Sequence, residues 1–158
     1  EKSFETATKL LLCPGASQVY YGDESARSLV VDGTIGDATL RSFMNWDAIQ
    51  NTSRTKAIME HWQKLGQFRA NHPSIGAGVH QMISESPYLF YRSFSKGNYK
   101  DLVVVGLDLP IGEKVLDVSK VFENADTLRD AYSGILNKVV DGKITIDSKF
   151  NILLLEKI

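Results

Sequence analysis

Two neighbouring carboxylates, Asp23 and Glu24, are the first side chains along the sequence that could share acid–base chemistry. A pair that cleaves a bond with one carboxyl as acid and the other as nucleophile needs the two groups about 5 Å apart, one kept protonated and the other ionised. Adjacent residues of an extended chain point to opposite faces, so these two side chains cannot converge on one bond. We therefore expect Asp23 and Glu24 to form hydrogen bonds and salt bridges at the end of a strand, rather than to act as a catalytic pair.

Arg41 and Trp46 are the candidate ligand-binding residues of the segment that follows, residues 25–51. An arginine can orient a hydroxyl or a carboxylate, although a salt bridge that braces the loop is the simpler interpretation. The apolar face of Trp46 can stack on a ring-shaped ligand, and the alternative is that it packs against the following helix. Residues 25–45 have no firm periodicity, and a loop of this length is usually either functional or an excursion of the chain.

The remaining reactive residue types form no recognisable centre. The histidines at 61, 72 and 80 lack the spacing of metal ligands, and we expect packing or surface roles for them. Cys13 is the single cysteine, so an internal disulfide is excluded. Neither a phosphate-binding glycine loop nor a nucleophile elbow is present in the sequence. The sequence therefore predicts no metal and no cofactor.

Composition narrows the class of protein. The 158 residues are 43% hydrophobic and carry a formal net charge of −1. This length suffices for one compact domain, or for a small domain plus part of another. Without a basic surplus, binding to nucleic acid has little support. The longest apolar runs are far too short to cross a bilayer, so no membrane association is expected.

The first half of the sequence predicts a mixed α/β arrangement. Ser3 is a plausible N-cap of a helix that Pro14-Gly15 ends, and Ser17–Tyr21 is typical of a short buried strand. A second helix begins after Asn51 or Thr52 and ends before Pro73. Its buried face is predicted from apolar residues at helical spacing, namely Ile58, Trp62, Leu65 and Phe68.

The second half predicts an antiparallel sandwich or barrel of short strands. Asp141-Gly142 is a strong signal for a two-residue hairpin turn. Glycines cluster near 74–78, where we expect the boundary between the two halves. The predicted strands are Val79–Ser84, Tyr88–Phe94, Leu102–Leu109, Lys114–Val118, Leu136–Val140, Lys143–Ile146 and Phe150–Glu156.

Four stretches, in the right order, resemble the α-amylase family (glycoside hydrolase family 13). The most specific is Leu10–Glu24, which ends in Pro-Gly-Ala-Ser-Gln-Val-Tyr-Tyr-Gly-Asp-Glu and resembles the seventh-helix and eighth-strand segment of that family. Arg41–Asp47 looks like the Arg-x-x-Met-x-Trp-Asp stretch that follows in many members. His61–Pro73 is similar to the last barrel helix, and residues 128–156 resemble the C-terminal β-domain.

The resemblance implies a fold class and two domains. Residues 1–76 would be the last segment of a (β/α)8 TIM barrel, comprising the seventh helix, the eighth strand, a rim loop and the eighth helix. Residues 77–158 would be an antiparallel Greek-key β-sandwich. Barrel enzymes build their active sites at the C-terminal ends of the strands. By resemblance, the residues at this rim that would bind substrate are Asp23, Glu24, Arg41 and Trp46.

The resemblance also implies a function. The parent protein would be a retaining hydrolase of α-glucans such as starch and maltooligosaccharides, although a related transglycosylase or isomerase would look the same here. The family takes its three catalytic carboxylates from strands four, five and seven, which would lie before Glu1. The His-Asp pair that normally precedes the seventh helix has no match. We therefore expect no catalytic residue in this chain and no activity from it alone.

The expected partners follow from the same resemblance. They are the remainder of the parent barrel and, in the parent, the α-glucan substrate, and a truncated barrel should also self-associate. Calcium in the parent enzyme would involve earlier barrel loops, and many members are secreted or periplasmic. Two alternatives for the β-rich half stay open, namely a non-catalytic carbohydrate-binding module and a purely structural domain.

Overall fold

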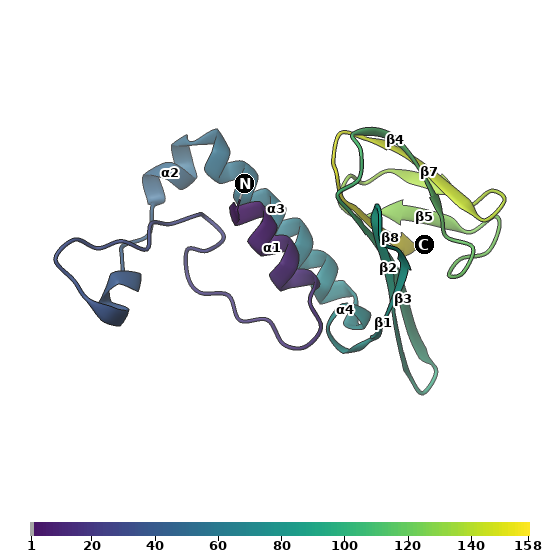
Figure 1. The fold of residues 1–158 in the computed structure, drawn as a ribbon, viewed down its shortest axis with the longest axis horizontal. Coiled ribbons are helices and arrows are strands. Elements are labelled where there is room, and N and C mark those ends of the chain that lie inside the picture. The colour runs from purple at the N-terminus through teal and green to yellow at the C-terminus, as the bar shows by residue number, and fades with distance from the viewer. Residues whose placement is uncertain (1) are drawn as a thin grey trace. The chain divides into compact units, whose positions relative to one another are not determined.

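The computed structural model describes residues 2–158, which divide into two compact units between Gly66 and Gln67. The first unit is helical with a long irregular segment, and the second is mostly antiparallel sheet (Figure 1). The division falls inside one long helix, so that the end of this helix belongs with the sheets. The domain boundary predicted at 76/77 stays a prediction.

The first unit holds α1, a 3-10 helix, α2 and the larger part of α3. Helix α1 and helix α3 lie side by side, and the ring of His61 joins them because its Nε2 is 3.0 Å from both Thr8 Oγ1 and the Phe4 carbonyl oxygen (Figure 1). The apolar stripe predicted for α3 is confirmed, since its side chains are at most 6% exposed. The bounds are α1 Lys2–Leu12, η1 Gly36–Leu40, α2 Trp46–Asn51 and α3 Ser53–Asn71.

Two expectations for this unit were wrong, and one helix was not predicted. Ser3 lies inside α1 and does not cap it, and α2 was not foreseen. Ser17–Tyr21 forms no strand, and its tyrosines are more than 40% exposed. A strand is stable only when a neighbour completes its hydrogen-bond ladder, and residues 2–66 supply no such neighbour.

The second unit is built from two sheets that face a common core. The larger sheet has the order β1-β2-β3-β8-β5-β6, the smaller pairs β4 with β7, and every pairing is antiparallel. Helix α4, Pro73–Ala77, contacts β2 and β3. The strands are β1 Val79–Ser84, β2 Tyr88–Lys96, β3 Tyr99–Leu107, β4 Gly112–Asp117, β5 Thr127–Asp130, β6 Leu136–Lys138, β7 Lys143–Ser148 and β8 Leu153–Lys157.

The central strands β3 and β8 are buried on both faces. Val104 lies opposite Leu155 in the register and points into the core between the sheets, while Val103 and Val105 point to the other face. All four are 0% exposed. This explains why the sequence here is a continuous apolar run instead of an alternating one. A two-sheet β-sandwich follows, as the sequence predicted.

A tight two-residue turn directly precedes β7 of the smaller sheet. Asp141 and Gly142 have φ of 50° and 72°, as a type I′ turn requires, and Val140 and Lys143 exchange two backbone hydrogen bonds of 2.9 Å. The predicted two-residue turn is confirmed, but it joins β6 and β7, which belong to different sheets, and Val140 and Lys143 form an isolated bridge. The short strand β5 was missed, because two of its four residues are charged. In the described part of the chain, helices are too short or too polar to cross a membrane.

Candidate functional site

Arg27 organises the irregular segment of the first unit. Its side chain is only 5% exposed and donates to the carbonyl oxygens of Tyr21, Leu40 and Ser42 at 3.0–3.1 Å. The guanidinium carbon also lies 4.0 Å from the centre of the Tyr21 ring, within the range of a cation–π contact. The guanidinium group of Arg27 thus links two loop segments, at residue 21 and at residues 40–42, that are distant in sequence.

Gly22 is required for this arrangement. Its φ is +85°, and an added Cβ would lie 2.4–2.8 Å from atoms of the Arg27 side chain. Any larger residue would therefore displace the arginine. The glycine that separates the two tyrosines from the two carboxylates is the point where the loop packs on itself.

Asp23 and Glu24 form hydrogen bonds within their own turn. Asp23 Oδ2 accepts from the Tyr20 amide at 3.2 Å, and Glu24 Oε2 accepts from the Gly22 amide at 3.0 Å. Both side chains are half-buried. Each carboxylate accepts a backbone hydrogen bond two or three residues away, which is a turn-stabilising geometry. The two carboxylates are therefore not arranged as a catalytic pair on either side of a substrate group.

Trp46 and Arg41 lie on the surface of the same segment. Trp46 is 63% exposed at the start of α2, and Arg41 is also exposed. Two side-chain hydrogen bonds between Ser25 and Asn45, of 2.7 and 3.0 Å, hold the start of α2 beside the turn that bears Asp23 and Glu24. The structure thus brings the predicted residues onto one loop cluster. An exposed indole can stack on a ring-shaped ligand, whereas acid–base catalysis needs a different arrangement of carboxylates.

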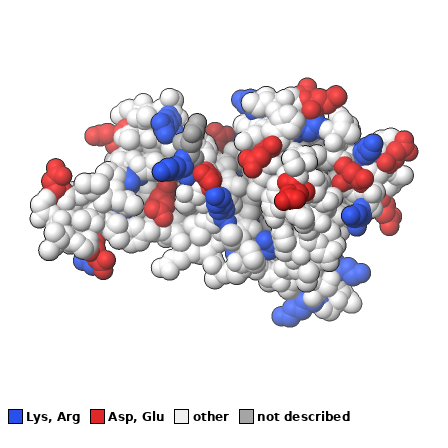
Figure 2. All heavy atoms as spheres, in the orientation of Figure 1, with Lys and Arg blue, Asp and Glu red and all other residues white. Residues whose placement is uncertain are grey.

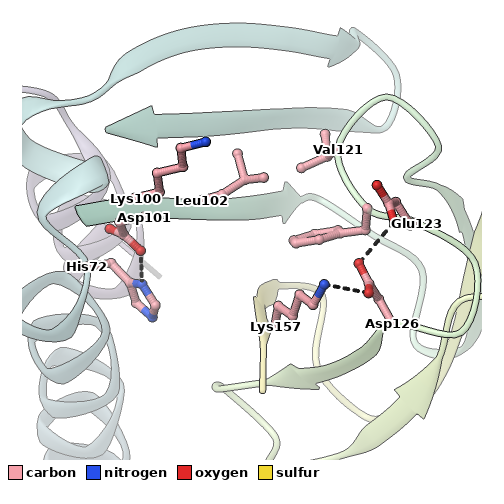
Figure 3. Close-up of a pocket in the computed structure, with 9 residues that line it drawn as sticks. His72, Lys100, Asp101, Leu102, Val121, Glu123, Asp126 and Lys157 are labelled. Carbon is pink, nitrogen blue, oxygen red and sulfur yellow. Dashed lines mark hydrogen bonds and ion pairs between the residues drawn. The ribbon is translucent and has the colours of Figure 1, made fainter. Parts of the chain in front are cut away.

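A second polar cluster lies in the sheet unit, centred on His72. Its Nδ1 is 2.8 Å from Asp101 Oδ1 on β3 (Figure 3), and its Nε2 is 2.6 Å from Glu156 Oε2 on β8. The second oxygen of Asp101 accepts from the Ser74 amide at 2.8 Å, and that of Glu156 contacts Arg129 Nε at 2.6 Å. His72, Asp101 and Glu156 are at most 9% exposed. No sequence pattern indicates this cluster, because its members are far apart along the chain.

The charge on Asp101 follows from these contacts. Burial alone raises the pKa of this carboxyl, but the hydrogen bonds from His72 and from the Ser74 amide outweigh it, and the pKa lies below its ordinary value. Asp101 is therefore an ionised acceptor inside the protein. Its role is to hold the chain between α3 and α4 against the sheet.

A cavity of about 340 Å³ opens beside the His72–Asp101 pair. Its apolar wall is formed by Leu102, Val121 and Phe122, and the Asp126–Lys157 ion pair, with Nζ 2.6 Å from the carboxylate, lies across from His72 (Figure 3). The cavity borders the polar cluster on one side and the sandwich core on the other. It gives water a route to two buried titratable groups.

The charged and the metal-ligating side chains of the described residues are dispersed. On the face in Figure 2, acidic and basic side chains are interspersed without a broad patch of one sign. Within residues 2–158, histidine, cysteine and carboxylate side chains nowhere gather in threes that could hold a metal ion. We derive no chemistry through calcium, which stays an expectation for the parent protein.

No family model matches the chain. A curated relative, the periplasmic alpha-amylase of Escherichia coli (strain K12), is 43% identical over 101 residues, which are 63% of this chain and 14% of the relative. The chain therefore spans only a small part of that enzyme's length.

Solved structures match nearly the whole chain. An Anoxybacillus alpha-amylase is 25% identical with a TM-score of 0.62, over 97% of this chain and 31% of that one. The alpha-amylase of Geobacillus thermoleovorans, complexed with acarbose, is 15% identical with a TM-score of 0.63, over 98% and 32%. AmyP in complex with maltose is 14% identical with a TM-score of 0.65, over 98% and 34%. By sequence and by fold, this chain is similar to the C-terminal part of α-amylase-family glycoside hydrolases, as its motifs predicted.

Proposed function

We propose that this chain is the C-terminal portion of an enzyme that hydrolyses α-glucans such as starch and maltooligosaccharides. The observation that carries the proposal is the 43% identity over 101 residues with an α-amylase. Solved structures with the same fold include complexes with maltose and with maltotriose, which supports a glucan as the substrate. The described residues present no pair of carboxylates placed to flank a bond, so the catalytic acids would come from the rest of the parent protein.

In this proposal, the first unit contributes to a barrel and its rim. The remainder of the barrel would cover large apolar side chains that are exposed here, including Phe43 at 97% and Ile35 at 90%. The stretch 17–21 would become the eighth strand once a neighbouring strand completes its ladder. Asp23, Glu24, Arg41 and Trp46 would then border the substrate, with Trp46 stacking on a glucose ring.

The sheet unit would stabilise the barrel rather than bind glucan. Its aromatic residues are mostly used in packing: Phe90 is 3% exposed and Phe122 is 5% exposed, so neither offers a platform for a sugar. The alternative, a carbohydrate-binding module, predicts retarded migration in a starch-containing gel. We expect unaltered migration. We also propose that the strands of this unit are connected as a Greek key.

A segment exchange tests the proposal directly. The matching segment of the Escherichia coli periplasmic α-amylase is replaced by this chain, and release of reducing sugar from starch and from maltooligosaccharides is measured. We expect the chimera to retain activity on both, and the isolated chain to release nothing. A chimera that folds, by circular dichroism, but does not cleave either substrate would contradict the proposal, as would activity from the isolated chain.

The rim assignment has its own test in the same chimera. Replacing Trp46 by alanine should raise KM for maltooligosaccharides about tenfold, the effect of losing one stacking contact of about 1.4 kcal/mol. The control is Asp37→Ala, which truncates an exposed polar side chain of the same loop. Equal effects of the two substitutions would show that the loop as a whole, and not Trp46, matters.

Two further features belong to the parent protein. The relative is named as periplasmic, so we propose that the parent is exported. The exposed apolar residues of the first unit should also make the isolated chain self-associate. A monodisperse monomer in light scattering at micromolar concentration would count against missing neighbours.

A further inference from the structure

The irregular segment of the first unit contains two arginines with opposite environments. Arg27 is 5% exposed, and each of its three side-chain nitrogens donates to a backbone carbonyl oxygen. Arg41 is exposed, and among the described residues its guanidinium forms no side-chain hydrogen bond or ion pair. One arginine is therefore committed to the fold, and the other keeps its donors available to a ligand.

The buried arginine holds the backbone that carries the exposed one. Arg27 Nη2 donates to the Leu40 carbonyl oxygen at 3.1 Å, and Nη1 donates to that of Ser42 at 3.0 Å. These two acceptors lie one residue before and one residue after Arg41. The Arg41 amide in turn donates to the Ala38 carbonyl oxygen at 3.2 Å. The backbone is thus fixed on both sides of Arg41, which sets the direction in which its side chain leaves the loop.

The planar fork of a guanidinium is what this arrangement needs at position 27. Its two terminal nitrogens can reach two carbonyl oxygens at once, whereas a lysine ammonium is a single point. Tyr21 reinforces the contact, because its hydroxyl donates to the Ser42 carbonyl oxygen at 3.1 Å and its ring centre lies 4.0 Å from the guanidinium carbon of Arg27. A substitution that keeps the positive charge but loses the fork should therefore loosen the backbone around Arg41.

Trp46 is held by a separate pair of side chains. Ser25 Oγ donates to Asn45 Oδ1 at 2.7 Å, and Asn45 Nδ2 donates to the Ser25 carbonyl oxygen at 3.0 Å. Asn45 directly precedes Trp46, so these bonds hold the start of α2 independently of the Arg27 contacts. The loop therefore has two anchors, one for the exposed guanidinium and one for the exposed indole.

We propose that Arg27 is a positioning residue of the substrate rim, which directs the Arg41 guanidinium toward the hydroxyl groups of a glucose unit. The inference rests on the proposed function, because the ligand it names is the α-glucan. A pyranose ring presents an apolar face, on which an indole can stack, and a rim of hydroxyls, to which a guanidinium can donate several hydrogen bonds. Arg27 itself touches no substrate, and its effect on binding passes through Arg41.

A double-mutant cycle in the chimera tests the inference. Arg27→Lys should raise KM for maltooligosaccharides about fivefold, the effect of losing one hydrogen bond to a neutral acceptor, with kcat changed less than about twofold. Arg41→Ala should have the same effect, and the two together should be no worse than either alone, because the second substitution removes a contact that is already lost. Combined with Trp46→Ala, in contrast, Arg27→Lys should multiply the effect on KM.

The matched control is Arg54→Lys, which makes the same change at an exposed arginine of α3 and should leave KM unchanged. Multiplying effects of Arg27→Lys and Arg41→Ala would overturn the inference, because Arg27 would then act on the loop as a whole. An unchanged KM in Arg27→Lys would also overturn it, since positive charge alone would suffice. If Arg27→Lys fails to fold by circular dichroism, Arg27→Met takes its place in the cycle.

A measurement on the isolated chain separates this inference from the proposed function. Trypsin cleaves after arginine, and mass spectrometry identifies the cut between Arg41 and Ser42. Arg27→Lys should make this cut about fivefold faster, because the backbone opens more easily with one hydrogen bond fewer, and Arg54→Lys should leave its rate unchanged. An unchanged rate in Arg27→Lys would overturn the inference whatever the activity of the chimera. A faster cut together with an inactive chimera would overturn the proposed function, and with it the role in substrate binding, but not the hold of Arg27 on Arg41.

Discussion

The two units differ in how completely they bury their apolar side chains. In the sheet unit, Val103, Leu128, Ile144 and Leu155 are all 0% exposed, and two sheets enclose one continuous core. In the first unit, large apolar residues such as Phe43 remain in water although a buried arginine holds the loop in place. The sheet unit therefore completes its own core, whereas the first unit buries one face of α3 but leaves large apolar side chains of its loop exposed.

The largest expected effect tests the self-sufficiency of the sheet unit. Asp130 is 0% exposed and accepts from the amides of Tyr132, Ser133 and Leu154 at 2.9–3.2 Å. Asp130→Ala leaves three buried donors without an acceptor, and we expect unfolding free energy to fall by about 3–5 kcal/mol. Urea denaturation followed by circular dichroism measures it. Asp147→Ala, at an exposed site on β7, should change stability by less than about 0.5 kcal/mol.

A smaller effect depends on pH and also belongs to the sheet unit. The pKa of Asp101 is lowered in the folded protein, so the folded state gains stability above the unfolded pKa of about 3.9 and loses it as pH falls through the lower folded value. Asp101→Asn should cost about 2 kcal/mol at neutral pH, and the difference from the unmodified chain should vanish in strong acid. Urea midpoints at several pH values show this. A difference that persists unchanged in strong acid would contradict the assignment.

The next effect should be confined to the first unit. Arg27→Met keeps an apolar stem but removes every donor to Tyr21, Leu40 and Ser42. Proteolytic cleavage within residues 28–45 should become about tenfold faster, because local opening becomes easier by roughly one charged hydrogen bond. The exposed Arg54 provides the control, and Arg54→Met should leave cleavage unchanged. Loss of protection in the sheet strands as well would show that opening of this loop also destabilises the sheet unit.

The smallest expected effect concerns Gly66, where the two units divide. Gly66 lies inside α3, and an added Cβ would meet nothing within 4 Å. Gly66→Ala should stabilise the helix by about 0.5–1 kcal/mol and raise the melting temperature by a few degrees. At Gly78, in contrast, a Cβ would lie 2.4 Å from the Ser74 carbonyl oxygen, so Gly78→Ala should destabilise. A lower melting temperature for Gly66→Ala would indicate that the helix needs its flexibility there.

The sequence was most informative where local chemistry decides the structure. Helical spacing identified the buried face of α3, and apolar runs bounded by turn residues identified most strands. Asp141-Gly142 identified a tight two-residue turn. The predicted rim residues Asp23, Glu24, Arg41 and Trp46 do share one loop cluster, but their role in binding stays a prediction. The failure at Ser17–Tyr21 has a different origin, because residues with strand propensity form a strand only beside a pairing partner.

By itself, then, the sequence determined the type and order of most helices and strands and the family resemblance, since propensity, periodicity and turn residues act over a few positions. The tertiary structure alone decided which distant polar residues meet. Arg27 reaches carbonyls from Tyr21 to Ser42, and His72 meets Asp101 and Glu156 because β3 and β8 are neighbours in the sheet. Long-range pairing of this kind depends on strand register and packing, which short-range sequence patterns do not encode.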